Sequence, residues 1–565
     1  MYLTQGLHRS LQRHPDKPAL RHVGDGDVRD HSFAGLLSDI ARHAAALQAR
    51  GVRPGDRVAL LAPNHDRLVR ALFACWWLGA VACPLNVRWS APELAYALSD
   101  SGASLLVVDQ ALAGGGRDLA LPVIDFEQLA HEAQGMQALP DVRAGGDTLA
   151  AILYTGGTTG RSKGVMLSHA NFWTASMTRG AELNNAPDSV SLLVAPLFHV
   201  AGLGRLVGQT LVGGTCVTMA HFKPGAVLEA IERHGISDVI VVPTMLQSLL
   251  DDPGFAPERV RSLNRIAFGA APMPPDLLER ALQAWPHAEF FQAYGLTETA
   301  GAVCINLPDN HRNPAALAQG RLNSVGRAGL GAEIQIVDES GRELPPGQAG
   351  MVLFRSPNLF SGFLDEADNR KAFTADGWLA TGDLGWLDEQ GRLNLTGRAK
   401  DLIIRSGHNI DPKVIEDALD AHPAVQLAAA VGAPDAYAGE VPVAYATLLP
   451  GASATEEELL AFVAQRVDEA PARPKRITVL QRMPTTNVGK IFKPELRQLA
   501  AIDTVQQRLQ ALWREAAPAG LPLPEVLPEG PAGLLLRAPD HPAWPTLAPA
   551  VADAVARLGV QARIA

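Results

Sequence analysis

The segment Tyr154-Thr-Gly-Gly-Thr-Thr-Gly-Arg-Ser-Lys-Gly164 is the sharpest local feature of this chain. It follows an apolar run, residues 149–153, that indicates a buried strand, and it precedes a helix expected to begin near Ser168. Its glycines let the backbone turn several N–H groups toward one anion, while the threonine hydroxyls and Lys163 add further donors. The spacing is not that of a Walker A loop. The segment therefore predicts a loop that binds a polyphosphate.

On both sides of this loop, strand patterns alternate with helical patterns. Apolar residues recur at helical spacing over 32–51, and Asn64 is expected to cap a helix that runs to Leu78 and ends at Gly79. Strands are expected over 57–62, 81–82, 105–109, 148–154, 191–195, 238–242 and 265–268. Strands separated by helices of this length indicate βαβ units, so we predict an α/β domain with two mainly parallel sheets.

The pattern changes after Gly326. Residues 333–338 and 350–355 indicate antiparallel strands, and 386–393 a further hairpin, which together predict a small β-barrel-like part. A smaller α+β domain is expected beyond Lys400. Its predicted elements are strands at 401–405, 425–431, 441–448 and 476–480 and helices at 412–421 and 455–467.

We therefore divide the chain into residues 1–399, a smaller domain over 400–500 and an extension over 501–565. In the extension we expect a helix over 504–516, a Pro-rich connector over 518–531 and a strand–helix–strand unit over 534–564. The extension contains no motif that indicates a function.

Composition excludes several classes of protein. Hydrophobic residues make up 47% of the 565 residues and charged residues 19%, with a net charge of −10 and no basic run, so nucleic-acid binding is disfavoured. The four cysteines show no CxxC spacing, and no apolar run is long enough for a membrane span or a signal peptide. We expect a cytoplasmic protein, with peripheral membrane contact and a homodimer left open.

Two further motifs carry groups suited to a nucleotide. In Phe291-Gln-Ala-Tyr-Gly-Leu-Thr-Glu298, Tyr294 can stack on a purine, Gly295 permits close approach, Thr297 can donate to a phosphate and Glu298 can bind Mg²⁺. In Trp378-Leu-Ala-Thr-Gly-Asp-Leu-Gly385, the carboxylate of Asp383 can accept hydrogen bonds from ribose hydroxyls.

Two more motifs follow, and the whole set resembles a known family. Gly397-Arg-Ala-Lys-Asp-Leu-Ile-Ile-Arg-Ser-Gly-His-Asn-Ile410 and Pro484-Thr-Thr-Asn-Val-Gly-Lys-Ile-Phe-Lys493 complete the order found in the adenylate-forming (AMP-binding) superfamily. The resemblance covers roughly nine-tenths of the chain. The chain departs from the usual pattern at Gly156, where Ser is usual, and at Ser162, where Pro is usual.

The resemblance implies an ATP-dependent acid–thiol ligase of the fatty-acyl-CoA synthetase type, with Mg²⁺ and coenzyme A. It assigns catalysis to Lys490, Thr297 and Glu298, the metal to Glu298, the hinge to Lys400 and the coenzyme A tunnel to Gly407. It assigns ATP binding to Thr155, Gly156, Gly157, Thr158, Thr159, Gly160, Lys163, Tyr294, Gly295, Thr297, Asp383, Arg398 and Lys490.

The segment Pro196-Leu-Phe-His-Val-Ala-Gly202 resembles the one that lines the acid tunnel in this family, with His199 at the tunnel. Small residues that we expect around the acid are Gly202, Gly269, Ala270 and Ala271. Such a lining suits an uncharged tail, and the Asp that would hold an amino-acid ammonium group is missing. A medium- or long-chain fatty acid is our first expectation, and an aryl or cyclic acid our second. A carrier protein as acceptor, and an inactive nucleotide-binding regulator, remain alternatives.

Overall fold

The computed structural model describes most of the chain. The described residues are 1–24, 26–112, 121–155, 162–183, 186–271, 273–398, 401–406, 408–467, 469–486, 490–516, 521–529 and 533–565. They form two compact units, one over 1–156, 162–381 and 386–395, and the other over 157–161, 382–385 and 396–565. The predicted division at Lys400 stays a prediction.

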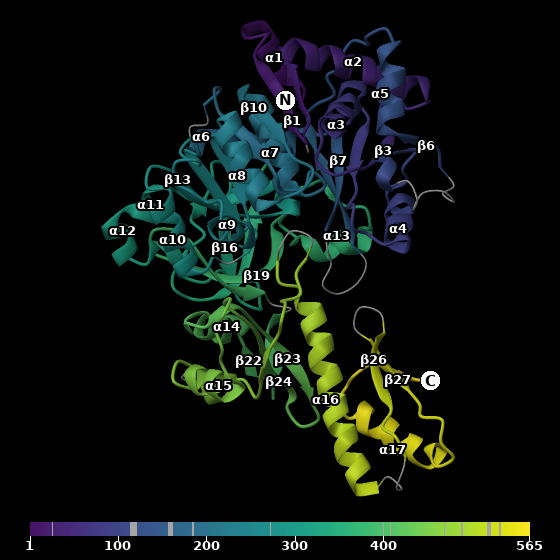
Figure 1. Cartoon of the computed structure of the whole chain (residues 1–565), viewed down its shortest axis with the longest axis vertical. Helices are drawn as coiled ribbons and strands as arrows, with labels where there is room; N and C mark the ends of the chain where they lie inside the picture. The colour runs from purple at the N-terminus through teal and green to yellow at the C-terminus, as the bar shows by residue number, and fades with distance from the viewer. Residues whose placement is uncertain are drawn as a thin grey trace. The chain divides into compact units, whose positions relative to one another are not determined.

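Two large sheets form the frame of the first unit (Figure 1). The nine-stranded sheet has the order β15 (Arg327–Ala328), β14 (Gly301–Asn306), β13 (Glu289–Leu296), β12 (Arg265–Gly269), β11 (Asp238–Val241), β9 (Val190–Leu193), β10 (Thr215–Thr218), β1 (Pro18–Val23) and β2 (Val28–Ser32). The seven-stranded sheet has the order β18 (Gly362–Phe363), β8 (Lys163–Ser168), β7 (Leu149–Thr155), β4 (Val81–Pro84), β3 (Arg57–Leu61), β5 (Leu105–Val108) and β6 (Val123–Asp125). Inner strands pair in parallel and antiparallel pairs lie toward the edges, which confirms the predicted α/β class.

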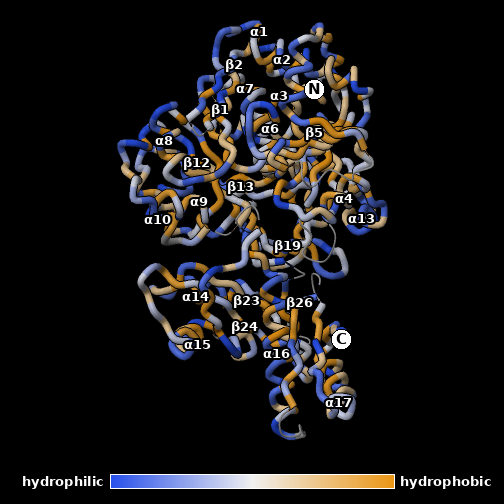
Figure 2. Tube along the Cα trace, turned by 45° about the vertical axis from the view of Figure 1, so that its right-hand side comes forward, coloured by the Kyte–Doolittle hydropathy of each residue, from blue (hydrophilic) through white to orange (hydrophobic). Residues whose placement is uncertain are grey.

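Helices cover both sheets. They are α1 (Gln5–Arg13), α2 (Phe33–Ala49), α3 (Asp66–Leu78), α4 (Ala91–Ser101), α5 (Phe126–Gln134), α6 (His169–Leu183), α7 (Val200–Val212), α8 (Pro224–His234), α9 (Pro243–Leu250), α10 (Pro275–Ala284), α11 (Asp309–Arg312), α12 (Pro314–Ala318) and α13 (Glu366–Ala372). One hydrophobic core joins α2, α3 and α7 to the seven-stranded sheet, and another joins α8, α9 and α10 to β11, β12 and β13. In Figure 2 the buried strand β5 is orange, the colour of hydrophobic residues, whereas the polar helix α13 is blue.

The glycine-rich segment leads into a strand that was not predicted. Before the helix expected near Ser168, β8 pairs antiparallel with β7, with Thr155 opposite Lys163. The helix α6 then begins at His169, as expected. The segment therefore connects two strands of a hairpin, and both of its ends are fixed by the same ladder of hydrogen bonds.

The predicted cap of α3 is wrong by one residue. His65 is the N-cap, because its Nδ1 accepts a hydrogen bond from the N–H of Leu68 at 2.9 Å. The side-chain amide of Asn64 instead forms hydrogen bonds with the backbone of residues 193–197. A contact that distant in sequence overrides the local preference of Asn for a cap.

A smaller antiparallel sheet adjoins these elements. Its strand order is β16 (Glu333–Val337), β17 (Gly350–Arg355), β19 (Leu379–Leu387) and β20 (Leu393–Arg398), with β16 and β17 antiparallel. The turn Asp388–Gly391 joins β19 to β20, as predicted for this hairpin. The side chains of Ile336, Val352, Phe354 and Leu393 pack together on one face of this sheet.

The second unit contains an α+β fold. Its sheet has the order β22 (His408–Ile410), β21 (Ile403–Arg405), β24 (Gly439–Leu448) and β23 (Val425–Asp435), with β25 (Ile477–Val479) parallel to β24. Two helices, α14 (Pro412–Asp420) and α15 (Glu456–Ala464), pack on one face, while α16 (Lys493–Ala516) packs against β23. All six elements that we predicted between 401 and 480 are present, with shifted bounds.

The extension is a folded unit built on α16 (Figure 1). The helix begins at Lys493 rather than at the predicted Thr504. Three strands, β26 (Glu525–Glu529), β27 (Gly533–Arg537) and β28 (Ala562–Ile564), and the helix α17 (Trp544–Ala556) pack against its second half. The strand β26 lies inside the predicted Pro-rich connector, so that prediction is wrong in part. Pro528 is compatible with β26 because the strand lies at an edge of its sheet.

Three buried histidines make the stability of the fold sensitive to acid. Burial lowers the pKa of His43, His169 and His311 to about 4 each, so only the unfolded chain takes up these protons between about pH 6.5 and 4. The free energy of unfolding should therefore decrease as the pH is lowered from about 6.5 to 4, by up to about 3 kcal/mol for each of these histidines. His31 opposes this, because hydrogen bonds to Asp39 and Asp66 raise its pKa, which adds stability below about pH 6.5 that is lost as pH rises through the folded pKa.

Urea unfolding followed by near-UV circular dichroism at about pH 7 and pH 4.5 tests this prediction. We expect a lower urea midpoint at the acid pH, and a smaller difference in the variant His311→Gln, which removes one of the three groups. An unchanged midpoint in the wild-type protein would contradict the prediction.

Candidate nucleotide and acid site

Thr155 and Lys163 lie at the two ends of the glycine-rich hairpin. The Lys163 Nζ is 2.7 Å from Asp368 Oδ1 on α13 and 5.0 Å from the centre of the Phe363 ring, and 41% of its side chain is exposed. The other predicted phosphate-binding residues, Gly156, Gly157, Thr158, Thr159 and Gly160, lie outside the described residues. On the strand before the loop, Tyr154 donates its hydroxyl hydrogen bond to Ala97 O or Asp100 Oδ2, which anchors β7 to α4.

The segment 360–364 connects the hairpin to the predicted metal ligand. The N–H of Phe360 donates to the Glu298 carbonyl at 2.8 Å, and the N–H of Leu364 donates to the Gly164 carbonyl at 2.9 Å. Between them, β18 pairs antiparallel with β8. Gly164 permits this approach, since a Cβ there would lie 2.4 Å from the side chain of Leu364. The structure therefore brings Lys163 and Glu298 to one side of the first unit.

Tyr294 and Gly295 lie at the end of β13, directly before the 3₁₀ turn Thr297–Thr299 that carries Thr297 and Glu298. The Tyr294 ring is 6.1 Å from that of Phe354, and a β-bulge separates Tyr294 from Gly295. Gly295 has no room for a side chain, because a Cβ would lie 1.9 Å from the Gly301 carbonyl oxygen. These four predicted residues thus lie within five positions, two at the end of the strand and two in the turn that follows it.

The two predicted ribose contacts, Asp383 and Arg398, lie on the neighbouring strands β19 and β20 and pair with each other. Arg398 Nε is 2.9 Å from Asp383 Oδ1. The Asp383 side chain is only 6% exposed, whereas 40% of the Arg398 side chain is exposed. The arrangement leaves the guanidinium accessible and holds the carboxylate in a fixed place beside it.

Lys490 lies where a short backbone pairing fixes the predicted catalytic loop. Its N–H donates to Thr486 Oγ1 at 3.1 Å, its carbonyl accepts from the N–H of Thr486 at 2.6 Å, and Thr485 forms an antiparallel bridge with Ile491. The helix α16 begins two residues after Ile491. The predicted hinge Lys400 and the predicted tunnel residue Gly407 lie outside the described residues.

His199 lies at the junction between β9 and α7. It is the N-cap of α7, and its Nδ1 accepts from the N–H of Ala201 at 3.2 Å. Gly202, in the first turn of the helix, packs directly against the backbone of Pro196, because a Cβ there would lie 2.2 Å from the Pro196 carbonyl oxygen. Glycine at 202 is therefore required by packing, whatever its distance from an acid.

The other predicted acid-pocket residues follow β12. At Gly269 a Cβ would lie 2.2 Å from the Ala293 carbonyl oxygen of β13. Ala270 has a φ of 67°, a left-handed conformation that a non-glycine residue adopts only when its surroundings impose it. Ala271 continues the bend after the strand. This strained backbone stands at the carboxyl end of a parallel strand, where ligands bind in open α/β sheets.

The donor set agrees with a magnesium ion that is held mainly by a substrate. Among the residues that the structure describes, no group of three His, Cys, Asp or Glu side chains could hold a metal. Mg²⁺ in nucleotide enzymes is held by one or two carboxylates together with substrate phosphates. A single hard oxygen ligand at Glu298, beside the hydroxyl of Thr297, fits that requirement.

Two sets of buried polar contacts were not predicted from the sequence. Arg205 of α7 and Asp238 of β11 form an ion pair with side chains 2% and 3% exposed, and Arg205 Nε donates to Ser191 Oγ at 2.9 Å. A lone arginine in an otherwise mostly apolar helix signals such a partner, because a buried charge requires compensation. No local signal could have revealed the three hydrogen bonds of Asn64 to residues 193–197.

Comparison with known proteins identifies the family. A model of the AMP-binding enzyme family matches residues 7–364, and one of the AMP-binding enzyme C-terminal domain matches residues 414–490. The chain is 36% identical over 497 residues to a feruloyl-CoA synthase from an Amycolatopsis species, covering 87% of this chain and 97% of that relative. It is 34% identical to a fatty acid–[acyl-carrier-protein] ligase from Streptomyces coeruleorubidus, covering 88% of this chain and 96% of that ligase.

A solved structure supports the same assignment. The fold matches o-succinylbenzoate CoA synthetase from Bacillus subtilis in complex with its acyl-adenylate intermediate, with a TM-score of 0.77 and 31% identity, covering 87% of this chain and 97% of that one. These matches confirm the predicted acid–thiol ligase class and its use of ATP, Mg²⁺ and coenzyme A. The chain belongs to the AMP-binding enzyme family, and it is an acid–CoA ligase of that family.

Proposed function

We propose that this ligase activates an aryl acid, converting it to an acyl-adenylate and then to its coenzyme A thioester. The main support is that a feruloyl-CoA synthase and an o-succinylbenzoate CoA synthetase, both named for aryl acids, are similar over nearly their whole length. Around the candidate acid site, close packing fixes the backbone whichever acid binds. Gly202 and Gly269 each pack against neighbouring backbone, and Ala270 is held in a strained conformation.

The first half-reaction joins the acid to AMP. A carboxylate oxygen attacks the α-phosphorus of ATP, the new O–P bond forms, the bond to the β-phosphate oxygen breaks and pyrophosphate leaves. Lys490 and Thr297 would stabilise the charge that grows on the α-phosphate oxygens, and Thr155 and Lys163 would hold the departing phosphates. Mg²⁺, held by Glu298, would neutralise phosphate charge. Tyr294, Gly295, Asp383 and Arg398 would hold the adenosine.

The second half-reaction transfers the acyl group. The thiol loses its proton to solvent, its sulfur attacks the acyl carbon, and the carbon–oxygen bond breaks, so that AMP leaves with the electron pair of that bond. A rotation about Lys400 would withdraw Lys490 and bring the Gly407 region to the adenylate. After the hinge, Asp401 pairs with Arg497 of α16 at 2.6 Å, which ties the start of the small domain to that helix.

A second candidate is a fatty acid passed to coenzyme A or to a carrier protein. The 34% identity to a fatty acid–[acyl-carrier-protein] ligase favours it. The alternative of an inactive nucleotide-binding regulator is weaker, because Lys163, Glu298, Asp383, Arg398 and Lys490 are all retained.

Pyrophosphate release by the purified protein with ATP and Mg²⁺ tests the proposal. Ferulate, indoleacetate, 2-succinylbenzoate, octanoate and palmitate are supplied in turn, with and without coenzyme A, and the thioester is identified by mass. We expect kcat/KM at least about tenfold higher for one aryl acid than for either fatty acid, a ratio that one well-fitted group can produce. A fatty acid as the best substrate would overturn the aryl assignment.

The predicted location and assembly also remain proposals. The four cysteines are buried and unpaired, which fits the reducing cytoplasm that the sequence predicts. In the described part of the chain, every helix is too short or too polar to cross a membrane. A homodimer and a peripheral membrane contact stay predictions.

A further inference from the structure

Asn64 holds the segment that leads to His199. The residue lies between β3 and α3 and is 4% exposed. Its Nδ2 donates to the carbonyls of Leu193 at 3.0 Å and Ala195 at 2.8 Å, and its Oδ1 accepts from the N–H of Leu197 at 2.9 Å. An amide side chain can donate twice and accept at once, so it satisfies three backbone groups along one extended segment.

The first turn of α7 rests on the same segment. The Pro196 carbonyl oxygen lies against Gly202, where a Cβ would be 2.2 Å away, and the Ala195 oxygen is nearly as close at 2.5 Å. The N–H of His199 donates to the Pro196 carbonyl at 3.0 Å. A shift of residues 195–196 would therefore move both His199 and the start of α7, because no free space separates them.

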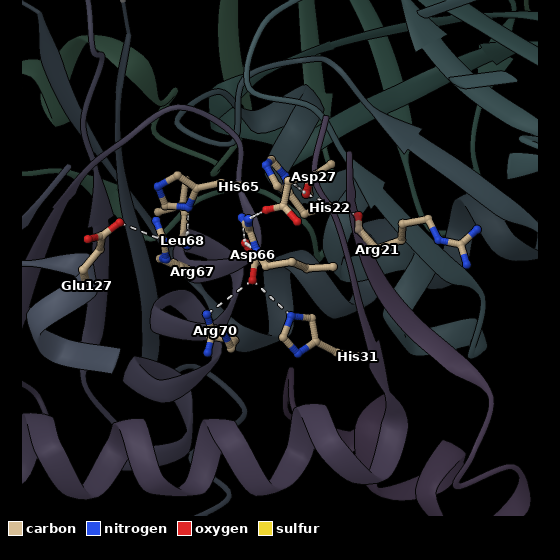
Figure 3. Close-up of polar contacts among 12 residues, drawn as sticks. Arg21, His22, Asp27, His31, His65, Asp66, Arg67, Leu68, Arg70 and Glu127 are labelled. Carbon is tan, nitrogen blue, oxygen red and sulfur yellow. Dashed lines mark hydrogen bonds and ion pairs between the residues drawn. The ribbon is translucent and has the colours of Figure 1, made fainter. Parts of the chain in front are cut away.

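Asn64 is itself fixed from several sides. His65 caps α3, and its Nε2 is 3.3 Å from Asp109 Oδ2, beyond β5. Figure 3 shows His31 and Arg70 pointing at the buried carboxylate of Asp66, at 3.0 and 3.3 Å. These contacts of residues 65 and 66 tie the turn between β3 and α3 to β2, α3 and the end of β5, which holds the backbone beside Asn64 in place.

We propose that Asn64 is a positioning residue of the acid site. It acts through the backbone of residues 193–197 on His199 and on the first turn of α7, and so helps to determine which acids fit. This inference rests on the proposed function only in taking His199 as part of the acid tunnel. The alternative is a purely structural link between the two large sheets, which would affect all substrates equally.

The variants Asn64→Ala and Asn64→Ser are compared with Asn306→Ala. Asn306 is a matched control: it is fully buried, and its Nδ2 also donates to two backbone carbonyls, those of Arg321 and Ser324, at 3.0 Å each. We expect the KM for the best acid to rise at least about tenfold in the Asn64 variants, while the KM for ATP stays within about twofold of the wild-type value. The reason is that these variants remove hydrogen bonds to residues 193–197, which lead to His199 of the proposed acid tunnel. The Asn306 variant should leave the acid KM unchanged. Equal changes in both KM values, or no change in either, would overturn the proposal.

Hydrogen exchange provides a readout that needs no substrate. The Leu197 amide should exchange at least about tenfold faster in Asn64→Ala than in the wild-type protein, with no such change in Asn306→Ala, because its acceptor is removed. Unchanged exchange across 193–202 would overturn the proposal. If the wild-type protein releases no pyrophosphate with any acid, the proposed function fails, and the exchange measurement still decides whether Asn64 holds this segment. If Asn64→Ala does not fold, Asn64→Ser serves for both measurements.

Discussion

Replacement of Lys490 by Ala is expected to lower acid-dependent pyrophosphate exchange by about 10³-fold, while thioester formation from supplied acyl-adenylate and coenzyme A stays nearly unchanged. The reason is electrostatic: the ammonium group would face the α-phosphate oxygens only while the carboxylate attacks phosphorus, and losing one preorganised donor there removes several kcal/mol of transition-state stabilisation. In the second half-reaction the same phosphate gains charge as AMP leaves, but the proposed rotation would already have withdrawn Lys490 from it, so this side chain would not contribute to that step. The two rates are measured separately, by isotope exchange and by thioester detection.

The variant is well suited to this test because the lysine's backbone carries the local structure. The hydrogen bonds to Thr486 and the bridge between Thr485 and Ile491 use main-chain atoms of residues 490–491 and survive truncation of the side chain. Lys413→Ala is the control, since Lys413 pairs with Asp417 on the surface of α14. Equal loss of both half-reactions in the Lys490 variant, or loss in the control, would contradict the assigned role.

Breaking the Arg205–Asp238 pair is expected to destabilise the first unit by about 3–5 kcal/mol. Either Arg205→Met or Asp238→Ala leaves one buried charge without its partner, and burial already lowers the pKa of Arg205 well below its usual range. The double variant removes both charges and should recover at least about half of the loss, because an uncharged pair needs no compensation. Urea denaturation of the three variants measures the free energies of unfolding.

A surface pair serves as the control for this comparison. Arg233 and Glu229 on α8 are 2.8 Å apart, with side chains 71% and 49% exposed, and Glu229→Ala should change the free energy of unfolding by less than about 1 kcal/mol. If the double variant instead lost as much free energy of unfolding as the two single variants together, the two charges would not compensate each other, and the prediction would be wrong.

Local sequence patterns predicted elements well where burial alone decides them. The run of apolar residues in β5 and the alternation of helices and strands in the first unit are such cases. The strand β8 was missed because its residues follow a loop that commonly leads to a helix, although Val165, Met166 and Leu167 suit a strand equally well. The early start of α16 was also missed, although Pro494 is compatible with the first turn of a helix.

Residue types predict Lys163, Glu298 and Asp383 as nucleotide-binding groups, and these assignments stay predictions. The structure places Lys163 and Glu298 on elements joined by residues 360–364. The hydrogen bonds of the Asn64 side chain, in contrast, are made to residues about 130 positions away in sequence. Its local neighbours favour a helix cap, so only the tertiary structure could reveal its contacts with residues 193–197.

The continuity of α16 has a consequence for observing the enzyme at work. Leu496 and Ala500 at its near end pack in the small domain that carries Lys490, whereas Val505 and Leu509 pack in the extension. A straight helix of 24 residues is about 36 Å long, so the extension is attached rigidly to the small domain at the far end of this helix. A turn of the small domain too slight to detect near its pivot would sweep that tip through a wide arc. A fluorophore placed beside Trp513 would therefore report the proposed rotation at the point where the displacement is largest.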